Sequence, residues 1–420
     1  MSTLDLYYPI KTELPFIMKI FIVCSRLGFG GAEHVGVMLA NGFADRGHIS
    51  YLLSNTNEEI CFPVNKNVNL YGIFPKSKNK IIKWIKAIFN TRSFLKKESP
   101  EVVIAIAETC SFISYLACTG LNIPIIYTAH NFFERPSSAP MGRWNKIAKY
   151  WLGRLYSKVT VLTEADKTFI GNRLKNVSVM PNPLELIPIH EIPIKQNAVL
   201  AAGRLDAWHV KGFDILLQAW SKIMKNEENE KMRNANWWLK IAGAGKLESF
   251  EYLMSILEDS DFKFQASSDG QKIWRSEKYH VEFLGFQKDI KKLYQEASIF
   301  VLSSRYEGFG LVLIEAMSQG CACVACDYKG RQREILSPLQ GDSLKVNGYS
   351  DHGIEVTENG ILCEPEDVEA LAKAIKKMIE DDEYRERICK NAIERSKYYS
   401  IENTMDRWDR LLHDVDVMKS

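Results

Sequence analysis

The sequence predicts an α/β protein built from two doubly wound parallel-sheet domains. Its apolar runs are short, β-branched and almost continuous, and segments of helical periodicity separate them, as in parallel sheets covered on both faces. The chain has 420 residues, and a single core stops growing at roughly 250–300 residues. We therefore expect two Rossmann-like domains, each with a core of its own.

Each half is expected to contribute six strands. In the first half the candidate strands are 19–24, 49–53, 102–106, 124–129, 158–163 and 177–180. In the second half they are 198–202, 238–242, 281–284, 299–302, 322–325 and 360–363.

A proline-rich stretch separates the two sets of strands. Pro183, Pro188 and Pro193 cannot continue a helix or a central strand, so we place an interdomain linker at 183–196. The predicted domains are accordingly 18–182 and 197–400.

The two ends of the chain are expected to differ. Residues 1–17 hold charged residues and no continuous apolar stretch, which predicts an extension outside the fold. Residues 401–420 are predicted to form a helix that packs back toward the N-terminal domain, because apolar residues recur at spacings of three and four at Trp408, Leu411, Leu412 and Val415.

Charge and hydropathy favour a cytoplasmic enzyme. The 54 basic and 52 acidic residues give a net charge of +2, which provides no overall field to attract nucleic acid. The N-terminal stretch lacks the features of a secretory signal, and no window reaches 18 consecutive apolar residues. We therefore predict neither a nucleic-acid partner nor a membrane span.

No metal site is predicted. The nine cysteines are odd in number and mostly lie in apolar runs, as free buried thiols do. Cys321, Cys323 and Cys326 are spaced like metal ligands, but they lack a second cluster and are expected to lie in a buried strand. Residues 414–416 have the D-x-D form of a metal site, yet they fall in the C-terminal helix and are expected to form a solvated face.

Residues 76–97 form a basic segment with apolar residues between the charges. It contains eight Lys or Arg residues and no acidic residue. Such a helix can lie on an anionic membrane, where each basic group contributes about 1 kcal/mol. Alternatively, its apolar residues Ile82, Ile85 and Phe89 belong to the core and the charges face solvent.

Two segments have the composition of a phosphate site. Gly30 and Gly31 follow the strand 19–24 and open a helix, where free N–H groups and the helix dipole favour a diphosphate. Their spacing is not G-x-G-x-x-G, and the segment lacks the Lys-Ser/Thr pair of a P-loop. Arg204 and Lys211 follow the strand 198–202, where two cations can neutralise a leaving diphosphate or simply cap a surface loop.

The segment from Glu307 to Glu315 is the strongest candidate for a site. A strand ends there, and a turn with Phe309 and Gly310 presents N–H groups before a helix begins. Glu307 is placed to meet sugar hydroxyls, and Glu315 to accept the hydroxyls of a ribose. A glycosidase pair is the competing interpretation, but its two carboxylates must flank the scissile bond, which one strand-turn-helix segment does not naturally provide.

The run from Glu307 to Glu315 resembles the E-x7-E signature of glycosyltransferase family 4, a group of retaining enzymes with the GT-B fold. Residues 30–33 are similar to the family's glycine loop, and residues 203–205 with Lys211-Gly212 are similar to its diphosphate-binding segment. Met180-Pro181-Asn182 resembles the turn before its linker. Arg204 and Lys211 lie seven positions apart, where about five is usual, so residues 206–210 are expected to form a longer loop.

The resemblance implies a role for each candidate residue. Arg204 and Lys211 would hold the donor diphosphate, Glu315 the ribose, and Glu307 the transferring sugar. His130 would contact the donor sugar near the reacting carbon. Gly31 would let the N-terminal domain close on the phosphates, and the strand ending at Gly285 and Phe286 would place backbone groups against the base. The backbone around Phe309 and Gly310 would hold the transferring sugar together with Glu307. Gly30 and Leu311 belong to the same donor-binding segments.

The predicted function is retaining transfer of a hexosyl unit from a nucleotide-diphosphate sugar, with UDP favoured and no metal required. The expected acceptor is a saccharide or polyprenyl-linked saccharide of cell-envelope polysaccharide synthesis, at the inner face of the plasma membrane if 76–97 binds lipid. A GDP-mannose-dependent mannosyltransferase and a catalytically silent nucleotide-sugar-binding protein are the alternatives. The base, the sugar and the acceptor are left open.

Overall fold

A computed structural model describes residues 17–134, 140–225, 235–257, 263–266, 272–337 and 353–417. Its contacts divide the chain into two compact units, one up to Pro183 together with the residues from Ile401, and one from Leu184 to Ser400. Except for Ile17, the expected extension 1–17 lies outside the described residues. The chain passes between units within the proline-rich stretch, and residues 184–195 belong to the second unit.

The first unit contains a seven-stranded sheet in the order β3-β2-β1-β4-β5-β6-β7, and all its strands are parallel. The strands are β1 (Lys19–Val23), β2 (Ile49–Ser54), β3 (Asn69–Gly72), β4 (Val102–Ile106), β5 (Ile125–Thr128), β6 (Lys158–Val161) and β7 (Val177–Val179).

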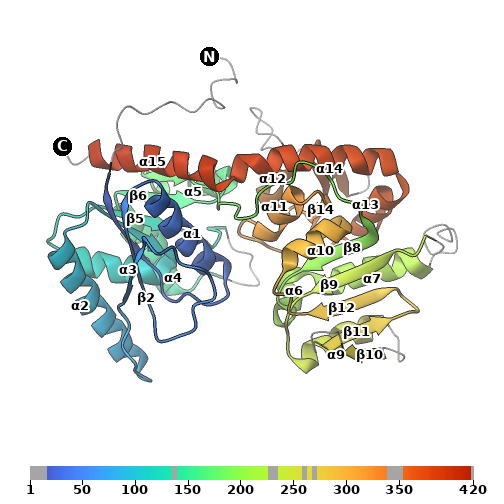
Figure 1. Ribbon diagram of the computed structural model, residues 1–420, viewed down its shortest axis with the longest axis horizontal. Helices are drawn as coiled ribbons and strands as arrows, with labels where there is room; N and C mark the ends of the chain where they lie inside the picture. The colour runs from blue at the N-terminus through green and yellow to red at the C-terminus, as the bar shows by residue number, and fades with distance from the viewer. Residues whose placement is uncertain are drawn as a thin grey trace, which may run out of the picture. The chain divides into compact units, whose positions relative to one another are not determined.

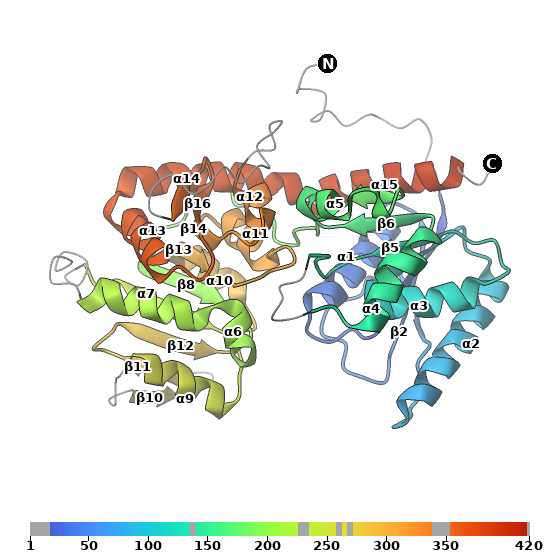
Figure 2. The ribbon, with the colours of Figure 1, turned by 180° about the vertical axis from the view of Figure 1, so that it is seen from behind.

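Helices cover both faces of this sheet. The strand order reverses between β1 and β4, so right-handed crossovers place α1 (Gly31–Asp45) on one face and α2 (Lys80–Glu98) and α3 (Ala107–Cys118) on the other. Figures 1 and 2 show α2 and α3 side by side. The shorter elements are α4 (Arg143–Lys146), the π-helical η1 (Ile147–Trp151), the 3-10 helices η2 (Leu152–Arg154) and η3 (Gly171–Arg173), and α5 (Glu164–Ile170).

The C-terminal helix α15 (Ile401–Val417) packs against α1 within the first unit. The two helices approach so closely that a Cβ atom at Gly42 would lie 2.7 Å from Met405 Sδ. Trp408 stacks edge-on against Phe43 with 6.0 Å between ring centroids. Arg46 completes the contact through ion pairs to Asp406 at 2.6 Å and Asp409 at 2.5 Å.

The second unit contains a nine-stranded sheet in the order β10-β11-β12-β9-β8-β13-β14-β16-β15. Its central strands are parallel, whereas β10, β11 and β15 pair antiparallel at the edges. The strands are β8 (Gln196–Ala202), β9 (Trp238–Ala242), β10 (Lys263–Ala266), β11 (Lys272–Ser276), β12 (Val281–Gly285), β13 (Ala297–Leu302), β14 (Ala322–Cys326), β15 (Ile354–Val356) and β16 (Gly360–Cys363).

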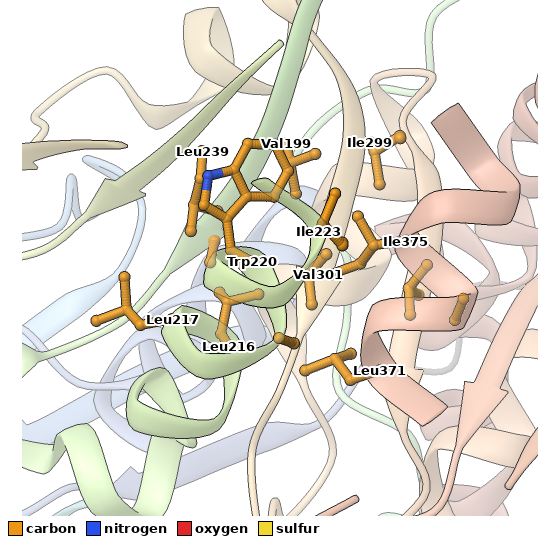
Figure 3. Packing of buried hydrophobic residues seen from close by; sticks show 14 of the residues in the cluster. Val199, Leu216, Leu217, Trp220, Ile223, Leu239, Ile299, Val301, Leu371 and Ile375 are labelled. Atoms are coloured by element: carbon orange, nitrogen blue, oxygen red, sulfur yellow. The ribbon is translucent and has the colours of Figure 1, made fainter. Parts of the chain in front are cut away.

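The core of the second unit lies between its sheet and the paired helices α7 (Phe213–Lys225) and α13 (Val368–Glu380). Figure 3 shows Trp220 of α7 among aliphatic side chains from β8, β9 and α13. The Trp220 indole is fully buried and donates its N–H to the Tyr279 carbonyl at 2.8 Å. The other helices are α6 (Trp208–Lys211), α9 (Leu247–Ile256), α10 (Ile290–Glu296), α11 (Leu311–Ser318), α12 (Arg331–Leu336) and α14 (Asp382–Ser396).

The structure confirms the predicted fold class and all twelve predicted strands. The four strands that the sequence did not reveal are β3, β10, β11 and β15, which have three to five residues each. Three of them, β3, β10 and β15, are edge strands, and β11 lies next to the edge strand β10. All nine cysteines are free, and Cys323 and Cys326 lie in the buried strand β14, as expected.

The ion pairs of Arg46 provide a test of how α15 is held. Burial alone would raise the pKa of Asp409, but hydrogen bonds from His48 and Arg46 outweigh it and hold that pKa below its usual value. The stabilisation is therefore present above the unfolded-state pKa of about 3.9 and is lost as the pH falls through the lower folded-state pKa.

We expect Asp409→Asn to lose roughly 1 kcal/mol at pH 7, or about 2–4 °C in Tm, and the loss to shrink in acid. Thermal unfolding at pH 7 and below pH 4 measures it. Asp414→Asn, an exposed carboxylate on the same helix, is the control. Equal Tm values for the Asp409 and Asp414 variants at pH 7 would rule out this role.

Candidate active site

Most of the predicted site residues gather at the carboxyl end of β8 and β13. These neighbouring strands mark the point where the strand order of the second unit reverses. Helices leave opposite faces of the sheet at such a point, and the crevice between the connecting loops is where open α/β sheets bind ligands. The loop after β8 contains Arg204 and Lys211, and the loop after β13 contains Glu307.

Backbone contacts join these two loops. The Arg305 N–H donates to the Val210 carbonyl at 2.9 Å, and the Ser303 hydroxyl donates to the Lys211 carbonyl at 2.9 Å. At Gly212 the backbone has φ of 65°, and a Cβ atom would lie 1.9 Å from the Ser303 carbonyl oxygen. Glycine is therefore required at Gly212 by both conformation and space.

The side chain of Arg305 makes a second connection between the loops. It donates to both carboxylate oxygens of Asp214 at 2.8 and 2.7 Å, and to the His209 carbonyl at 2.6 Å. The Asp214 hydrogen bonds raise the pKa of Arg305. A bidentate pair fixes orientation as well as distance, and the side chains are only 12% and 9% exposed. Sequence reasoning missed both residues.

Lys211 and Glu307 form an ion pair at the centre of the crevice. Lys211 Nζ lies 2.6 Å from Glu307 Oε2, and the Ser304 hydroxyl is 3.4 Å from the same oxygen. Both side chains are about one-fifth exposed, so a ligand can reach them. Arg204 is exposed, and it follows Gly203, where a Cβ atom would lie 3.3 Å from Lys211 Cγ. The intervening residues form η4 (Leu205–Ala207) and α6, as expected of a longer loop.

The turn after Glu307 leads directly into helix α11. Gly310 adopts the left-handed conformation with φ of 96°, and α11 begins at Leu311. Phe309 is buried and stacks edge-on against Tyr399. Glu315 lies in the second turn of α11 and accepts a hydrogen bond from the Tyr294 hydroxyl at 3.0 Å. Burial raises the pKa of Tyr294, so its hydroxyl remains a donor to Glu315.

A third glycine loop, which the sequence reasoning missed, follows β9. Its residues 243–245 pack against the turn after β8, where a Cβ atom at Gly243 would lie 1.8 Å from the Gly203 carbonyl oxygen. The Gly243 N–H donates to the Gly285 carbonyl at 2.8 Å, which aligns the loop with the predicted base-binding segment. Phe286 beside it is 44% exposed. The sequence signal that could have predicted this loop is the pair of glycines after the predicted strand 238–242.

The first unit holds the remaining predicted residues, Gly30, Gly31 and His130. Gly30 precedes α1 with an extended backbone (φ of −178°), so its conformation does not itself require glycine. The side chain of Glu33, in the first turn of α1, pairs with Arg26 at 2.7 Å.

His130 follows β5, and its Nε2 lies 3.1 Å from the Thr128 hydroxyl. That hydroxyl donates to the Ala105 carbonyl at 3.1 Å, so it accepts from His130 and places the ring proton on Nε2. Burial lowers the pKa of His130 to about 4 despite the nearby charges of Glu108 and Glu33. The Asn182 side chain acts in the opposite direction and partly offsets the lowering of the pKa. Among the described residues, no group lies in hydrogen-bond geometry with Nδ1. The ring is therefore neutral at pH 7 with Nδ1 as an acceptor.

The described residues contain neither a metal-binding cluster nor a membrane-spanning helix. Within the described ranges, no three His, Cys, Asp or Glu side chains are grouped so that they could hold a metal ion. Of the helices that the structure describes, none combines enough length with enough apolar residues to cross a bilayer.

The two parallel-sheet units and the loops at the strand-order reversal are those of a GT-B nucleotide-sugar glycosyltransferase. Comparison with known proteins identifies the family. The profile described as Glycosyl transferases group 1 matches residues 184–395, and the profile described as Glycosyltransferase Family 4 matches residues 29–187. The chain belongs to this family of glycosyltransferases. The family resemblance predicted from Glu307 to Glu315 is thereby confirmed.

Curated relatives match over nearly the whole chain. One is the Campylobacter jejuni GalNAc-α-(1→4)-GalNAc-α-(1→3)-diNAcBac-PP-undecaprenol α-1,4-N-acetyl-D-galactosaminyltransferase, which is 26% identical over 95% of this chain and 99% of its own. An uncharacterized glycosyltransferase of Haemophilus influenzae is also 26% identical, over 91% and 96%.

Solved structures share the fold. Sucrose-phosphate synthase from Thermosynechococcus elongatus superposes with a TM-score of 0.73 at 16% identity, over 95% of this chain and 99% of that one. Anabaena HepE in complex with UDP-glucose gives a TM-score of 0.67 at 19% identity, over 94% and 100%.

The Arg305–Asp214 pair predicts a measurable effect on donor binding. Asp214→Asn removes the charge that Arg305 neutralises and weakens both bonds between the loops, so we expect UDP affinity to fall about tenfold with a lowered Tm. Calorimetric titration with UDP measures the affinity.

Glu366→Gln is the matched control for this experiment. Glu366 is the other carboxylate near Arg305, at 3.6 Å from Nε, but its side chain is 67% exposed, and exposed pairs contribute little. Equal UDP affinity in the two variants would contradict the role assigned to Asp214.

Proposed function

We propose that the protein transfers a hexosyl unit from a UDP-sugar to a lipid-linked saccharide, with retention of configuration. The observation that carries the proposal is the Lys211–Glu307 ion pair beside Arg204 at the strand-order reversal of the second unit. Cations and a sugar-binding carboxylate meet there, as cleavage of the bond between an anomeric carbon and a diphosphate requires.

The proposed reaction places charge where those cations lie. As the glycosidic bond to the diphosphate breaks, negative charge grows on the leaving phosphate oxygen, and Arg204 with Lys211 would stabilise it without a metal. Binding of the donor would draw Lys211 from Glu307 to the phosphates and free Glu307 for sugar hydroxyls. Glu315 would accept the ribose hydroxyls, and His130 Nδ1 a hydroxyl of the transferring sugar.

Retention would then follow a front-face course. The departing phosphate oxygen accepts the proton of the acceptor hydroxyl as that hydroxyl attacks the same face of the sugar. No protein nucleophile is needed in this reaction.

Relatives support the choice of donor and acceptor. The Campylobacter jejuni relative is named for a PP-undecaprenol-linked acceptor. An Escherichia coli relative, 22% identical over 67% of this chain, is named UDP-Gal:α-D-GlcNAc-diphosphoundecaprenol α-1,3-galactosyltransferase. These names favour a UDP-sugar over GDP-mannose and a polyprenyl-linked acceptor over a free saccharide.

Helix α2 fits a lipid-linked acceptor because it presents apolar side chains to the outside. Ile81, Ile85 and Phe89 recur every four residues and are 71%, 48% and 67% exposed. The helix buries only Ala87, Thr91 and Leu95. The alternative in which Ile82, Ile85 and Phe89 belong to the core is therefore wrong. We propose that this basic and apolar surface docks on the anionic inner face of the plasma membrane.

The cations at the site provide the first test. Arg204→Ala and Lys211→Ala are each expected to lower turnover on the order of 10²–10³-fold, the scale of removing one charge-stabilising donor. Release of UDP from a UDP-hexose in the presence of acceptor measures turnover. Lys390→Ala, an exposed lysine of α14, is the control. Wild-type turnover in both site variants would remove these residues from the mechanism.

The surface of α2 provides the second test. Ile85→Ser with Phe89→Ser removes two exposed apolar side chains, and we expect binding to vesicles with 30% anionic lipid to weaken at least tenfold. Ile194→Ser, at a fully exposed residue of the second unit, should leave binding unchanged. Wild-type binding that is indifferent to anionic lipid and salt would exclude the membrane contact.

A further inference from the structure

A buried lysine in the first unit supports the loop next to His130. Lys149 is completely buried, and a buried ammonium group must be paired and hydrogen-bonded. No feature of the sequence drew attention to it. Its hydrogen-bond partners therefore indicate which part of the structure the buried lysine stabilises.

The partners of Lys149 belong to the chain just after His130. Lys149 Nζ donates to the carbonyls of Asn131 at 2.8 Å and Phe132 at 3.1 Å. It also lies 4.4 Å from the centroid of the Phe133 ring. From the other side, the Phe133 N–H donates to Asp166 Oδ1 at 2.9 Å. Residues 131–133 are thus held at both their carbonyl and N–H groups.

Glu108 supplies the counter-charge for Lys149. Its Oε1 lies 3.3 Å from Lys149 Nζ, and its Oε2 accepts from the Asn131 side chain at 3.4 Å. Burial alone would raise the pKa of Glu108, but the charge of Lys149 outweighs it and lowers that pKa. Lys149, Glu108 and Asn131 therefore form one connected network.

Two irregularities of the backbone accompany the pair. Ala107, which places Glu108 after β4, has φ of 64°, a left-handed conformation that is strained for a residue with a Cβ. Lys149 lies in the π-helical turn η1, and π-helical turns are frequent at functional sites. Moreover, β1 and β4 mark the strand-order reversal of the first sheet. Glu108 follows β4 and therefore lies at the carboxyl edge of the sheet, where open α/β sheets bind ligands.

We infer that Lys149 and Glu108 are positioning residues, which hold the backbone after β5 so that His130 presents its ring and carbonyl in one orientation. The inference rests on the role proposed for His130 in transfer. The hydrogen bonds of the pair go to residues 131 and 132, which follow His130 in the chain. The charge of Glu108 also acts on the imidazole, where it opposes the effect of burial on the pKa.

The test is a double-mutant cycle between Lys149 and His130. Lys149→Met removes the charge at similar length, and we expect kcat to fall about 10–100-fold, the effect of a misplacement near 1 Å. The KM for the UDP-sugar should stay within about threefold, because the side chains proposed to bind the nucleotide, Arg204, Lys211 and Glu315, lie in the second unit. In a His130→Ala background, Lys149→Met should have almost no further effect.

Glu108→Gln keeps the shape of the side chain and covers the case in which Lys149→Met does not fold. Its kcat should fall in the same range, with the same lack of effect in the His130→Ala background. Lys146→Met, an exposed lysine one turn earlier, is the control and should have wild-type kinetics. Nitrogen NMR of the His130 ring should show the Nε2–H tautomer in the wild type and a mixture in Lys149→Met.

The outcomes separate this inference from the proposed function. Full activity in His130→Ala would overturn the role of the histidine and the inference with it. If His130→Ala is impaired but the Lys149 and His130 effects multiply, the histidine keeps its role and the positioning inference fails. Wild-type kcat in Glu108→Gln and an unchanged ring tautomer in Lys149→Met would also overturn it.

Discussion

The bidentate contact between Arg305 and Asp214 is the interaction on which the candidate donor site depends. Two loops leave opposite sides of the strand-order reversal in the second unit, and each contains residues to which the proposed function assigns a role. Arg305 joins the loops by binding Asp214 at the start of α7 and the His209 carbonyl in the preceding turn. Hydrogen bonds to the Val210 and Lys211 carbonyls join the same loops, and Lys211 faces Glu307.

The ion pair between Lys211 and Glu307 has a consequence for how the site binds its donor. Each charge is paired with the other before a ligand binds, so neither residue carries an isolated charge. In the proposed function, a diphosphate would offer Lys211 a partner of higher charge, and sugar hydroxyls would offer Glu307 hydrogen-bond donors. Binding would then exchange one set of partners for another at charges that are already paired. Preorganised charges of this kind are usually the largest contribution to catalysis.

Much of the fold could be predicted from the sequence because parallel strands buried on both faces leave a clear pattern. Runs such as 102–106 and 322–325 are fully apolar, and both are central strands. Edge strands such as β3 are short and half-solvated, so their composition resembles that of loops. Gly310 was identifiable because its turn joins a strand to a helix. The Gly243–Gly245 loop had the same signal but was overlooked.

The interactions that hold the site together could not be predicted in this way. Arg305 and Asp214 lie 91 positions apart, and Lys149 and Glu108 lie on different helical elements. A charged residue on a helix is usually solvated, so the sequence gives no sign that Lys149 is buried. For α2 the periodicity allowed both a core and a surface role, and only the exposed fractions of Ile85 and Phe89 decided between them.

The central claim is that the second unit activates a UDP-sugar for transfer. The most direct measurement follows nucleoside diphosphate release from UDP-, GDP- and ADP-hexoses with an undecaprenyl-diphosphate-linked saccharide, with the anomeric configuration of the product assigned by NMR. We expect release of UDP that depends on the acceptor, and a product with the configuration of the donor. Release of no nucleoside diphosphate from any donor, or an inverted product, would contradict the account.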